Sequence, residues 1–204
     1  MHKLLLAAVL AASVGAAHAG TTNLVVDGSF EDQLQAAGSW TVYSAINGWT
    51  TVGGSGIEVR NQVAGNAFDG ANYVELDSTS NSAMAQTLTT VAGAQYSLSF
   101  AYAARAGVSA GSNPIEVLWN GLSLATVTAN GNGQSGNAWQ LFDYVVTGSG
   151  SDTLGFRAVG VSDSYGGSLD AVTVTAVPEP STYAMMFAGL VAIGFSLRGR
   201  RNKR

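Results

Sequence analysis

The side chains that could do chemistry in this 204-residue chain are almost all carboxylates. Both histidines, His2 and His18, lie near the N-terminus, the chain has no cysteine, and residues 20–177 contain no lysine. Ser-His-Asp and Cys-His sites, histidine zinc sites and lysine Schiff-base chemistry are therefore excluded from this segment. The one common catalytic plan left is a carboxylate pair, as in glycosidases. Its candidates are Glu58, Glu75, Asp77 and Glu116.

A second kind of chemistry open to this composition is the binding of a sugar by aromatic rings and a few polar groups. We predict a ligand site that contains Trp49, Tyr73, Arg105 and Trp119. Each residue also has an ordinary structural role, because large aromatic residues are usually core and an arginine at a strand end can pair with an acid. Further candidates of the same types are Trp40, Tyr102, Trp139 and Arg60.

The charge of the chain is distributed unevenly. Residues 20–177 hold twelve of the thirteen acids but only three of the nine basic residues, Arg60, Arg105 and Arg157, so this segment has a net charge of −9. Nucleic acids and anionic lipids need a basic face, and we therefore expect no nucleic-acid partner. An acidic surface suits solubility and divalent cations.

The elements that must position these side chains are predicted to be β-strands. In residues 95–103 the large side chains Tyr96, Leu98, Phe100 and Tyr102 alternate with serine and alanine, which is the period of a strand with one buried face. Asn120-Gly121 lies between two β-type runs, 115–119 and 122–127, and predicts a hairpin with a type I′ turn. Further strands are predicted at the start of the domain within 23–32 and over 71–76, 82–88, 139–146, 153–159 and 168–175.

Short strands separated by turn signals, with no helical pattern between them, predict an all-β fold, a β-sandwich or jelly roll, over residues 20–177. Residues 1–19 have a positive start, an apolar run and an Ala17-His18-Ala19 cleavage signal, so they predict a secretory signal peptide with a signal helix, removed by signal peptidase. The absence of cysteine means that no disulfide stabilises the exported domain.

The C-terminal end, residues 178–204, has three parts: Pro178-Glu179-Pro180, an apolar helix candidate over 182–197, and a basic end over 198–204. The prolines should stop the last strand and hold Glu179 extended. Sixteen helical residues span about 24 Å, which is short for a hydrocarbon core of about 30 Å. We therefore expect a transmembrane helix that anchors the chain only transiently in the inner membrane, although an ordinary single-span anchor fits the same pattern.

Three stretches, NLVVDGSFE, YVELDS and GGSLDAVTVTAVPEP, resemble exported proteins with a galactose-binding-domain-like β-sandwich, including carbohydrate-binding modules and the DUF642 family. The tail resembles the PEP-CTERM sorting signal, also catalogued as an ice-binding protein C-terminal domain. This second resemblance implies Pro178, Glu179 and Pro180 as the sorting motif, an exosortase as partner, and a final place at the cell surface or in an extracellular polysaccharide or biofilm matrix.

The first resemblance also implies a structural calcium ion where the first and last strands meet. Glu31 and Asp170 match the family's carboxylate ligands, and Gly28 and Ser29 match positions that offer backbone carbonyls. Calcium takes six to eight oxygen ligands in flexible geometry. The alternative is that Glu31 is a turn acid and Asp170 is a hydrogen-bonding residue at a strand end.

Taken together, these observations predict an exported, non-enzymatic β-sandwich protein that associates with extracellular polysaccharide. Two alternatives stay open. One is a structural matrix or surface protein without a specific ligand, and the other is a carboxylate-type enzyme that acts on glycosides. Ice binding, which needs a regular threonine array, has only weak support from TLTT and TVTVT.

Overall fold

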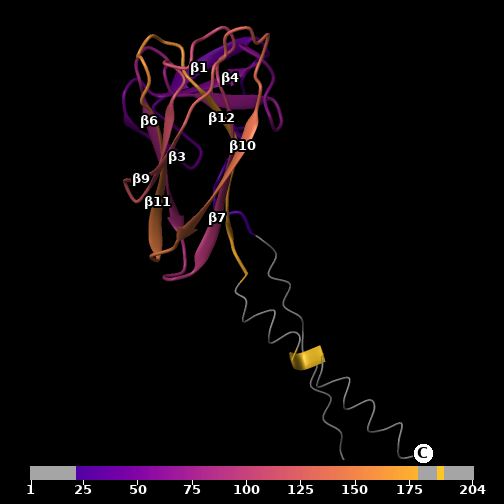
Figure 1. Ribbon diagram of the computed structural model, residues 1–204, viewed down its shortest axis with the longest axis vertical. Helices are drawn as coiled ribbons and strands as arrows, with labels where there is room; N and C mark the ends of the chain where they lie inside the picture. The colour runs from indigo at the N-terminus through magenta and orange to yellow at the C-terminus, as the bar shows by residue number, and fades with distance from the viewer. Residues whose placement is uncertain (1–21, 179–187, 191–204) are drawn as a thin grey trace, which may run out of the picture.

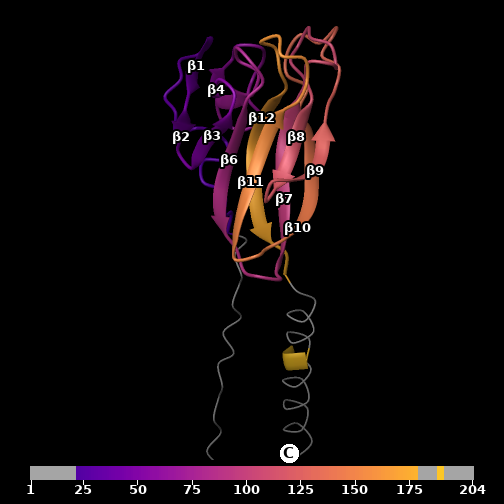
Figure 2. The same ribbon diagram turned by 90° about the vertical axis from the view of Figure 1, so that its left-hand side faces the viewer.

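The computed structural model describes residues 22–178 and 188–190, and the described residues form a sandwich of two antiparallel β-sheets (Figure 1, Figure 2). Sheet A has, in spatial order, β1 (Ser39–Tyr43), β4 (Ile57–Asn61), β5 (Asn72–Glu75), β12 (Ser168–Ala176), β7 (Gln95–Ala103) and β10 (Gln140–Thr147). Sheet B has β2 (Ala45–Ile46), β3 (Trp49–Gly53), β6 (Ala83–Thr89), β11 (Ser151–Ala158), β8 (Ile115–Trp119) and β9 (Leu122–Val127). The prediction of an all-β sandwich is confirmed.

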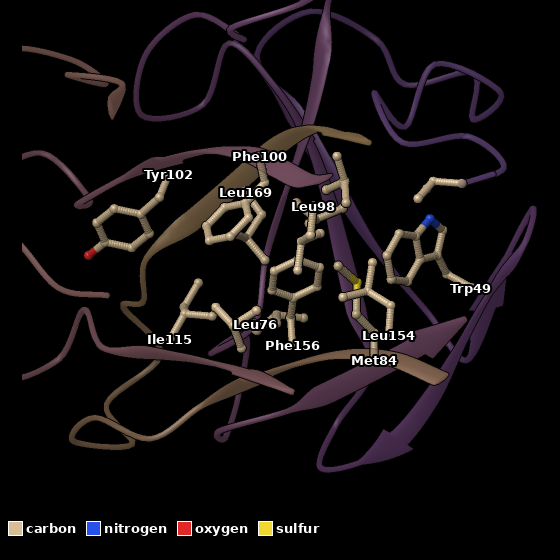
Figure 3. Close-up of a cluster of buried hydrophobic side chains, with 14 of the residues drawn as sticks. Trp49, Leu76, Met84, Leu98, Phe100, Tyr102, Ile115, Leu154, Phe156 and Leu169 are labelled. Atoms are coloured by element: carbon tan, nitrogen blue, oxygen red, sulfur yellow. The ribbon is translucent and has the colours of Figure 1, made fainter. Parts of the chain in front are cut away.

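The core lies between the two sheets and is built from the inward side of each strand (Figure 3). On β7, Leu98, Phe100 and Tyr102 are fully buried, as their alternation with small residues predicts. Phe100 meets Phe156 of β11 across the sandwich, with ring centroids 5.2 Å apart. Burial of this kind is the main stabilising contribution in a domain that has no disulfide.

The hairpin of β8 and β9 has the turn that its sequence predicts. Asn120 and Gly121 both have positive φ, 53° and 76°, as a type I′ turn requires. Both strands have the predicted bounds, and β11 pairs with the other side of β8.

The segment before β1 corrects one prediction, because residues 23–32 form no regular strand. Leu24 N donates to Val174 O, and Val172 N donates to Gly28 O, so this segment follows β12. Val174 N donates to the side-chain Oδ1 of Asn23. This N–H group is therefore not available for a backbone hydrogen bond between two paired strands. At Gly28 a Cβ atom would lie 2.0 Å from Val172 O, so the close approach of the two backbones requires glycine.

The two ends of the described domain lie at the same end of the sandwich (Figure 1). Val177, the residue after the end of β12 and before Pro178, donates its N–H to Gln95 O at the start of β7. The nine residues of β7 then lead to the opposite end, about 26 Å away at 3.3 Å per residue. β1 and β4 lie toward this opposite end in both views (Figure 1, Figure 2).

Several predictions fall on residues outside the described part of the chain. These are the signal peptide over 1–19, Glu179 and Pro180 of the sorting motif, and most of 182–204. Residues 188–190 are described and are helical. Among the described residues, no helix has the length and apolar character needed to span a membrane.

Candidate functional site

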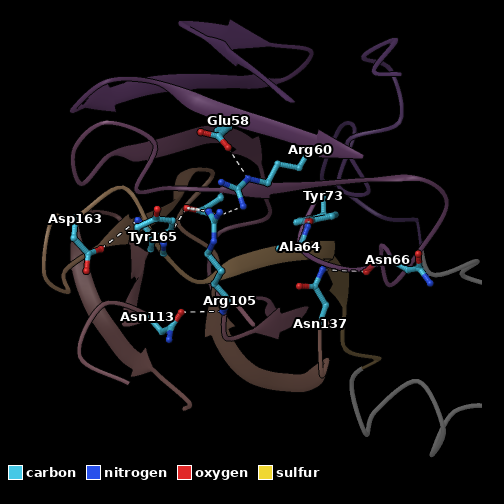
Figure 4. A network of polar contacts seen from close by, with 12 residues as sticks. Glu58, Arg60, Ala64, Asn66, Tyr73, Arg105, Asn113, Asn137, Asp163 and Tyr165 are labelled. Carbon is cyan, nitrogen blue, oxygen red and sulfur yellow. Dashed lines mark hydrogen bonds and ion pairs between the residues drawn. The ribbon is translucent and has the colours of Figure 1, made fainter. Parts of the chain in front are cut away.

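A buried ionic network occupies the outer face of sheet A (Figure 4). Glu58 and Arg60 are alternate residues of β4, and Glu75, at the end of β5, is the register partner of Glu58. All three therefore point away from the core. Arg60 Nε lies 2.5 Å from Glu58 Oε1, and Arg60 Nη1 lies 2.5 Å from Glu75 Oε2. Arg105, just after β7, adds its Nη1 at 2.9 Å from Glu75 Oε2.

Glu75 is the centre of this network and is fully buried. Its Oε1 also accepts a hydrogen bond of 2.9 Å from Gly166 N, in the loop before β12. Burial raises the pKa of Glu75 to about 7, against the opposing attraction of Arg60 and Arg105. Two glutamates and two arginines thus make a network with a formal charge of zero under the surface of an acidic domain.

Tyr165 covers the network at its solvent side. The guanidinium carbon of Arg105 lies 4.6 Å from the centroid of the Tyr165 ring, a cation–π contact. Asp163 orders this loop, because its Oδ1 accepts from Tyr165 N, its Oδ2 accepts from Ser112 Oγ, and its own N–H donates to Asp77. The Tyr165 side chain is therefore positioned although it is 48% exposed.

A group of aromatic rings lies next to the network. Tyr73 is the register partner of Arg60, and its ring meets Trp139 edge-on, with centroids 5.7 Å apart. Phe68 contacts the same Trp139 at 6.3 Å. Asn66 O accepts hydrogen bonds from Trp139 Nε1 at 2.9 Å and from Asn137 Nδ2 at 3.1 Å, and these bonds join the loops on either side (Figure 4). The result is a rigid aromatic platform.

Three aromatic side chains are exposed among the described residues. Trp40 and Tyr165 border the ionic network, and Phe68 belongs to the aromatic platform next to it. Trp40 on β1 is the register partner of Arg60 and is 53% exposed. Phe68 is 45% exposed and meets Trp139 of the platform edge-on, and Tyr165 covers Arg105. Exposed rings grouped on one face usually indicate a binding surface. We call Trp40, Phe68 and Tyr165 the aromatic face.

Only part of the predicted ligand site belongs to this region. Arg105 is in the network, and Tyr73 lies in the platform but is fully buried, with its hydroxyl accepting from Ala64 N. Trp49 and Trp119 are 1% and 7% exposed and lie in sheet B, with Trp49 packed against Phe156. These two residues correct the prediction: they are core residues, because their strands turn the rings toward the opposite sheet.

The four candidate catalytic acids do not form one exposed group. Glu58 and Glu75 are neighbours but are 2% and 0% exposed and held by arginines, so no substrate reaches them in this structure. Asp77 is buried and accepts from Asp163 N. Glu116 lies on sheet B, where it pairs with Arg157.

Backbone donors already occupy the predicted calcium ligands. Glu31 Oε1 accepts from Ala71 N and Asn72 N, and Asp170 Oδ2 accepts from Phe68 N and Asp69 N. The predicted carbonyl ligand of Gly28 accepts from Val172 N, and Ser29 is half-buried in the same turn. No group of three or more acidic residues suited to a metal occurs among the described residues. This arrangement does not fit an oxygen shell for calcium, and it matches the alternative roles of a turn acid and a strand-end hydrogen-bonding residue.

Asp170 has a further property, since it is fully buried and has no cation among its hydrogen-bond or ion-pair partners. Burial raises its pKa to about 7, although the N–H groups of Asp69, Ala171 and Phe68 oppose this shift.

Sequence reasoning did not single out Phe68 and Tyr165, and it named Trp40 only as a further candidate. A signal for the first two was present. Each is a lone aromatic residue among glycine, asparagine, aspartate and serine, in AFDGAN and DSYGG, with no alternating apolar partners. An aromatic residue in a turn-rich stretch has no strand to bury it, which favours exposure.

Comparison with known proteins identifies the end of the chain. Residues 176–201 match the model described as the PEP-CTERM protein-sorting motif. The chain carries a PEP-CTERM protein-sorting motif. The PEP-CTERM tail indicates an exported protein that is anchored transiently at the membrane and processed by an exosortase. The described sandwich ends where this motif begins, because β12 ends at Ala176.

The chain has relatives among curated proteins. The "Multifunctional-autoprocessing repeats-in-toxin" of Vibrio cholerae serotype O1 is 32% identical over 157 residues, which is 75% of this chain but 3% of the toxin. The protein of the same name from Vibrio vulnificus is 32% identical over 158 residues, 74% of this chain and 3% of that protein. The PEP-CTERM chain thus spans a very small part of these relatives.

Solved structures with some likeness to the chain include three binding or adhesin domains. A family 16 carbohydrate-binding module has a TM-score of 0.49 at 14% identity and covers 74% of this chain and 99% of its own. The K2 cleaved adhesin domain of Lys-gingipain has a TM-score of 0.48 at 17% identity and covers 74% of this chain and 97% of its own. A CBM35 from Paenibacillus barcinonensis has a TM-score of 0.42 at 22% identity and covers 67% of this chain and 99% of its own. These likenesses are distant, and no residue role is transferred from them.

Proposed function

We propose that this exported protein is non-enzymatic and associates with neutral extracellular polysaccharide through its aromatic face. The observation that carries the proposal is the grouping of the exposed aromatic side chains of the described residues: Trp40 and Tyr165 lie beside the buried ionic network, and Phe68 lies on the aromatic platform next to it. Sugar rings present C–H faces that pack on aromatic rings, and hydroxyl groups that bond to the polar rim. The PEP-CTERM tail supports the extracellular location.

The charges favour a neutral ligand over an acidic one. Each of the three arginines among the described residues has an acidic partner: Arg60 and Arg105 pair with Glu75, and Arg157 pairs with Glu116. None is free to hold a uronate or sulfate bidentately. Since residues 20–177 also have a net charge of −9, an anionic polymer is repelled at long range.

The test is retention of the full-length protein in affinity gels that contain a neutral polysaccharide, such as a galactan or a glucan, or an acidic one, such as alginate. We expect retention by at least one neutral polymer. Trp40→Ala, Phe68→Ala and Tyr165→Ala should each weaken it by about fivefold or more, as expected when one exposed ring contributes about 1 kcal/mol.

Matched controls come from sheet B, where Val52 on β3 and Leu122 on β9 are exposed apolar residues outside the aromatic face. Val52→Ala and Leu122→Ala should leave retention unchanged. Absence of retention by all polymers, including those of the producing cell, would contradict the proposal and favour a structural matrix protein. Equal losses in all five variants would also contradict it, because binding would then not depend on the aromatic face.

Structural calcium at Glu31 and Asp170 stays a prediction from the resemblance. Both oxygens of Asp170 accept backbone hydrogen bonds, so calcium would have to compete with these donors, whereas at Glu31 only Oε1 accepts backbone bonds. Thermal melts in calcium and in chelator test it: calcium binding to the folded state raises the midpoint. An unchanged midpoint would contradict a calcium site, as would an equal shift in Asp170→Asn.

A further inference from the structure

Two turns and the residues after β12 form the end of the sandwich from which the sorting tail leaves; β6 and β12 both end there (Figure 2). We call residues 90–95, 147–151 and 176–177 the tail-side surface. Its parts bond to one another. Gly148 N, between β10 and β11, donates to Ala94 O, between β6 and β7, at 2.8 Å. Val177 N donates to Gln95 O at 2.9 Å, so the exit of the chain is fixed to the same surface.

One buried acid makes this surface rigid. Asp152 is fully buried, and its Oδ2 accepts from Thr90 Oγ1 in one turn and from Ser149 N in the other. Its Oδ1 accepts from Asn120 Nδ2 of the β8–β9 hairpin at 2.6 Å. A single carboxylate thus holds both turns and the neighbouring hairpin, and the tail-side surface keeps its shape when it meets another surface.

The tail-side surface has no charge and carries exposed apolar side chains. Its three ranges contain no lysine, arginine, aspartate or glutamate, although residues 20–177 have a net charge of −9. Val91 is 66% exposed and Val177 is 37% exposed, and Val145, two residues before this surface on β10, is 65% exposed. Such a surface can enter a headgroup layer without the burial of an unpaired charge.

The sequence that follows keeps this surface close to the membrane. The apolar run 182–197 begins five residues after Val177, and five extended residues span at most about 18 Å. The PEP-CTERM tail indicates transient anchoring at the membrane. While the tail is anchored, an encounter of the sandwich with the lipid surface is intramolecular. Because a short connection gives an effective concentration in the millimolar range, a small apolar contact is enough to populate the bound arrangement.

We propose that the tail-side surface lies against the lipid bilayer while the sorting tail anchors the protein. The lipid chemistry that suits it is a zwitterionic headgroup layer, because this surface offers no lysine or arginine to an anionic lipid. The contact would direct β7 away from the bilayer and keep the aromatic face on the far side of the sandwich. It does not depend on polysaccharide binding.

The experiment uses the absence of cysteine, since a single introduced cysteine can carry a dye at one chosen site. Full-length Val91→Cys, Val145→Cys and Val161→Cys, each labelled with a nitrobenzoxadiazole dye, are reconstituted in phosphatidylcholine vesicles with and without a nitroxide quencher on the lipid headgroup. Val161 is the control, because it is 59% exposed and follows the far end of β11. We expect the quencher to lower the fluorescence about twofold or more at Val91, less at Val145 and not at Val161.

Charge variants test the cause of the contact. Val91→Glu adds a charge that is costly to bury, so it should lower the quenching of a dye at position 145 about twofold, whereas Val161→Glu should not. Both positions are exposed, so both variants keep the fold.

Equal quenching at all three labelled sites would overturn the proposal, because the sandwich would then move freely on its tail. Failure of the protein to float with the vesicles would overturn it as well. Dye fluorescence at Val91 that changes with the protein-to-lipid ratio but not with the quencher would place a second copy of the chain on this surface, and would also overturn it.

Discussion

Replacing Glu75 with glutamine should change how the stability of the sandwich depends on pH. Glu75 is fully buried, and burial raises its pKa from 4.5 to about 7. A carboxyl group whose pKa is raised by folding contributes stability that is fully present below pH 4.5 and is lost as the pH rises through about 7. The ionisation of Glu75 should therefore lower the unfolding free energy of the wild-type protein between pH 5 and pH 8. Glu75→Gln has no carboxyl group at this site and should not show this loss.

The magnitude follows from the two pKa values. At 1.36 kcal/mol per tenfold change, the difference between 4.5 and about 7 is worth about 3 kcal/mol, of which about 2 kcal/mol falls between pH 5 and pH 8. Glu75→Gln also removes the ion pair with Arg60, a cost that lowers stability at every pH. The gap in unfolding free energy between wild type and variant should thus narrow by about 2 kcal/mol as the pH rises.

Urea unfolding followed by tryptophan fluorescence at pH 5, 6, 7 and 8 measures this gap. Glu116→Gln is the matched control, because Glu116 also pairs with an arginine, Arg157, but does so at the surface. The pKa of Glu116 is lowered, chiefly by hydrogen bonds from Ser123 and Arg157, so its gap should stay constant over this range. A gap for Glu75→Gln that stays constant or widens as the pH rises would refute the reasoning.

Two further predictions concern other buried positions. Asp152 is buried, which opposes ionisation, but hydrogen bonds from Asn120, Thr90 and Ser149 lower its pKa to about 2. The variant Asp152→Asn should therefore be about 2 kcal/mol less stable than wild type above pH 4. Acid unfolding curves should show this difference shrinking as the pH falls toward 2. Gly28→Ala should lower the melting temperature markedly, because the added Cβ would lie 2.0 Å from a backbone oxygen. Gly111→Ala is the control, since its Cβ would meet only a side-chain atom at 4.0 Å, and its melting temperature should not change. Equal melting temperatures for the two variants would contradict the close approach at Gly28.

The strands in the second half of the domain could be predicted because local rules determine them. β7 alternates large and small side chains over nine residues, and Asn120-Gly121 defines the turn between β8 and β9 without any distant contact. The segment 23–32 could not be read in this way. Its path depends on hydrogen bonds to β12, about 150 residues later, and one of these uses the side chain of Asn23.

The candidate sites were harder to predict, because residue type alone does not determine burial. Trp49 and Trp40 both lie in strands of similar composition, yet the first is 1% and the second 53% exposed. Only the packing of the two sheets decides which face of a strand is inside. The side-chain amides of Asn61 and Asn72 are held by backbone carbonyls 26 to 42 positions away, and no local pattern indicates such contacts.

The placement of both domain ends at one end of the sandwich sets an orientation. The sorting motif begins at residue 176, beside the start of β7, and β7 crosses the domain before Arg105 and the aromatic face are reached. In a copy held through its C-terminal end, the sandwich itself would thus be a stiff spacer of about 26 Å between the end of β12 and the proposed binding surface. Because this spacer is folded β-sheet, its length does not vary as that of a flexible linker does.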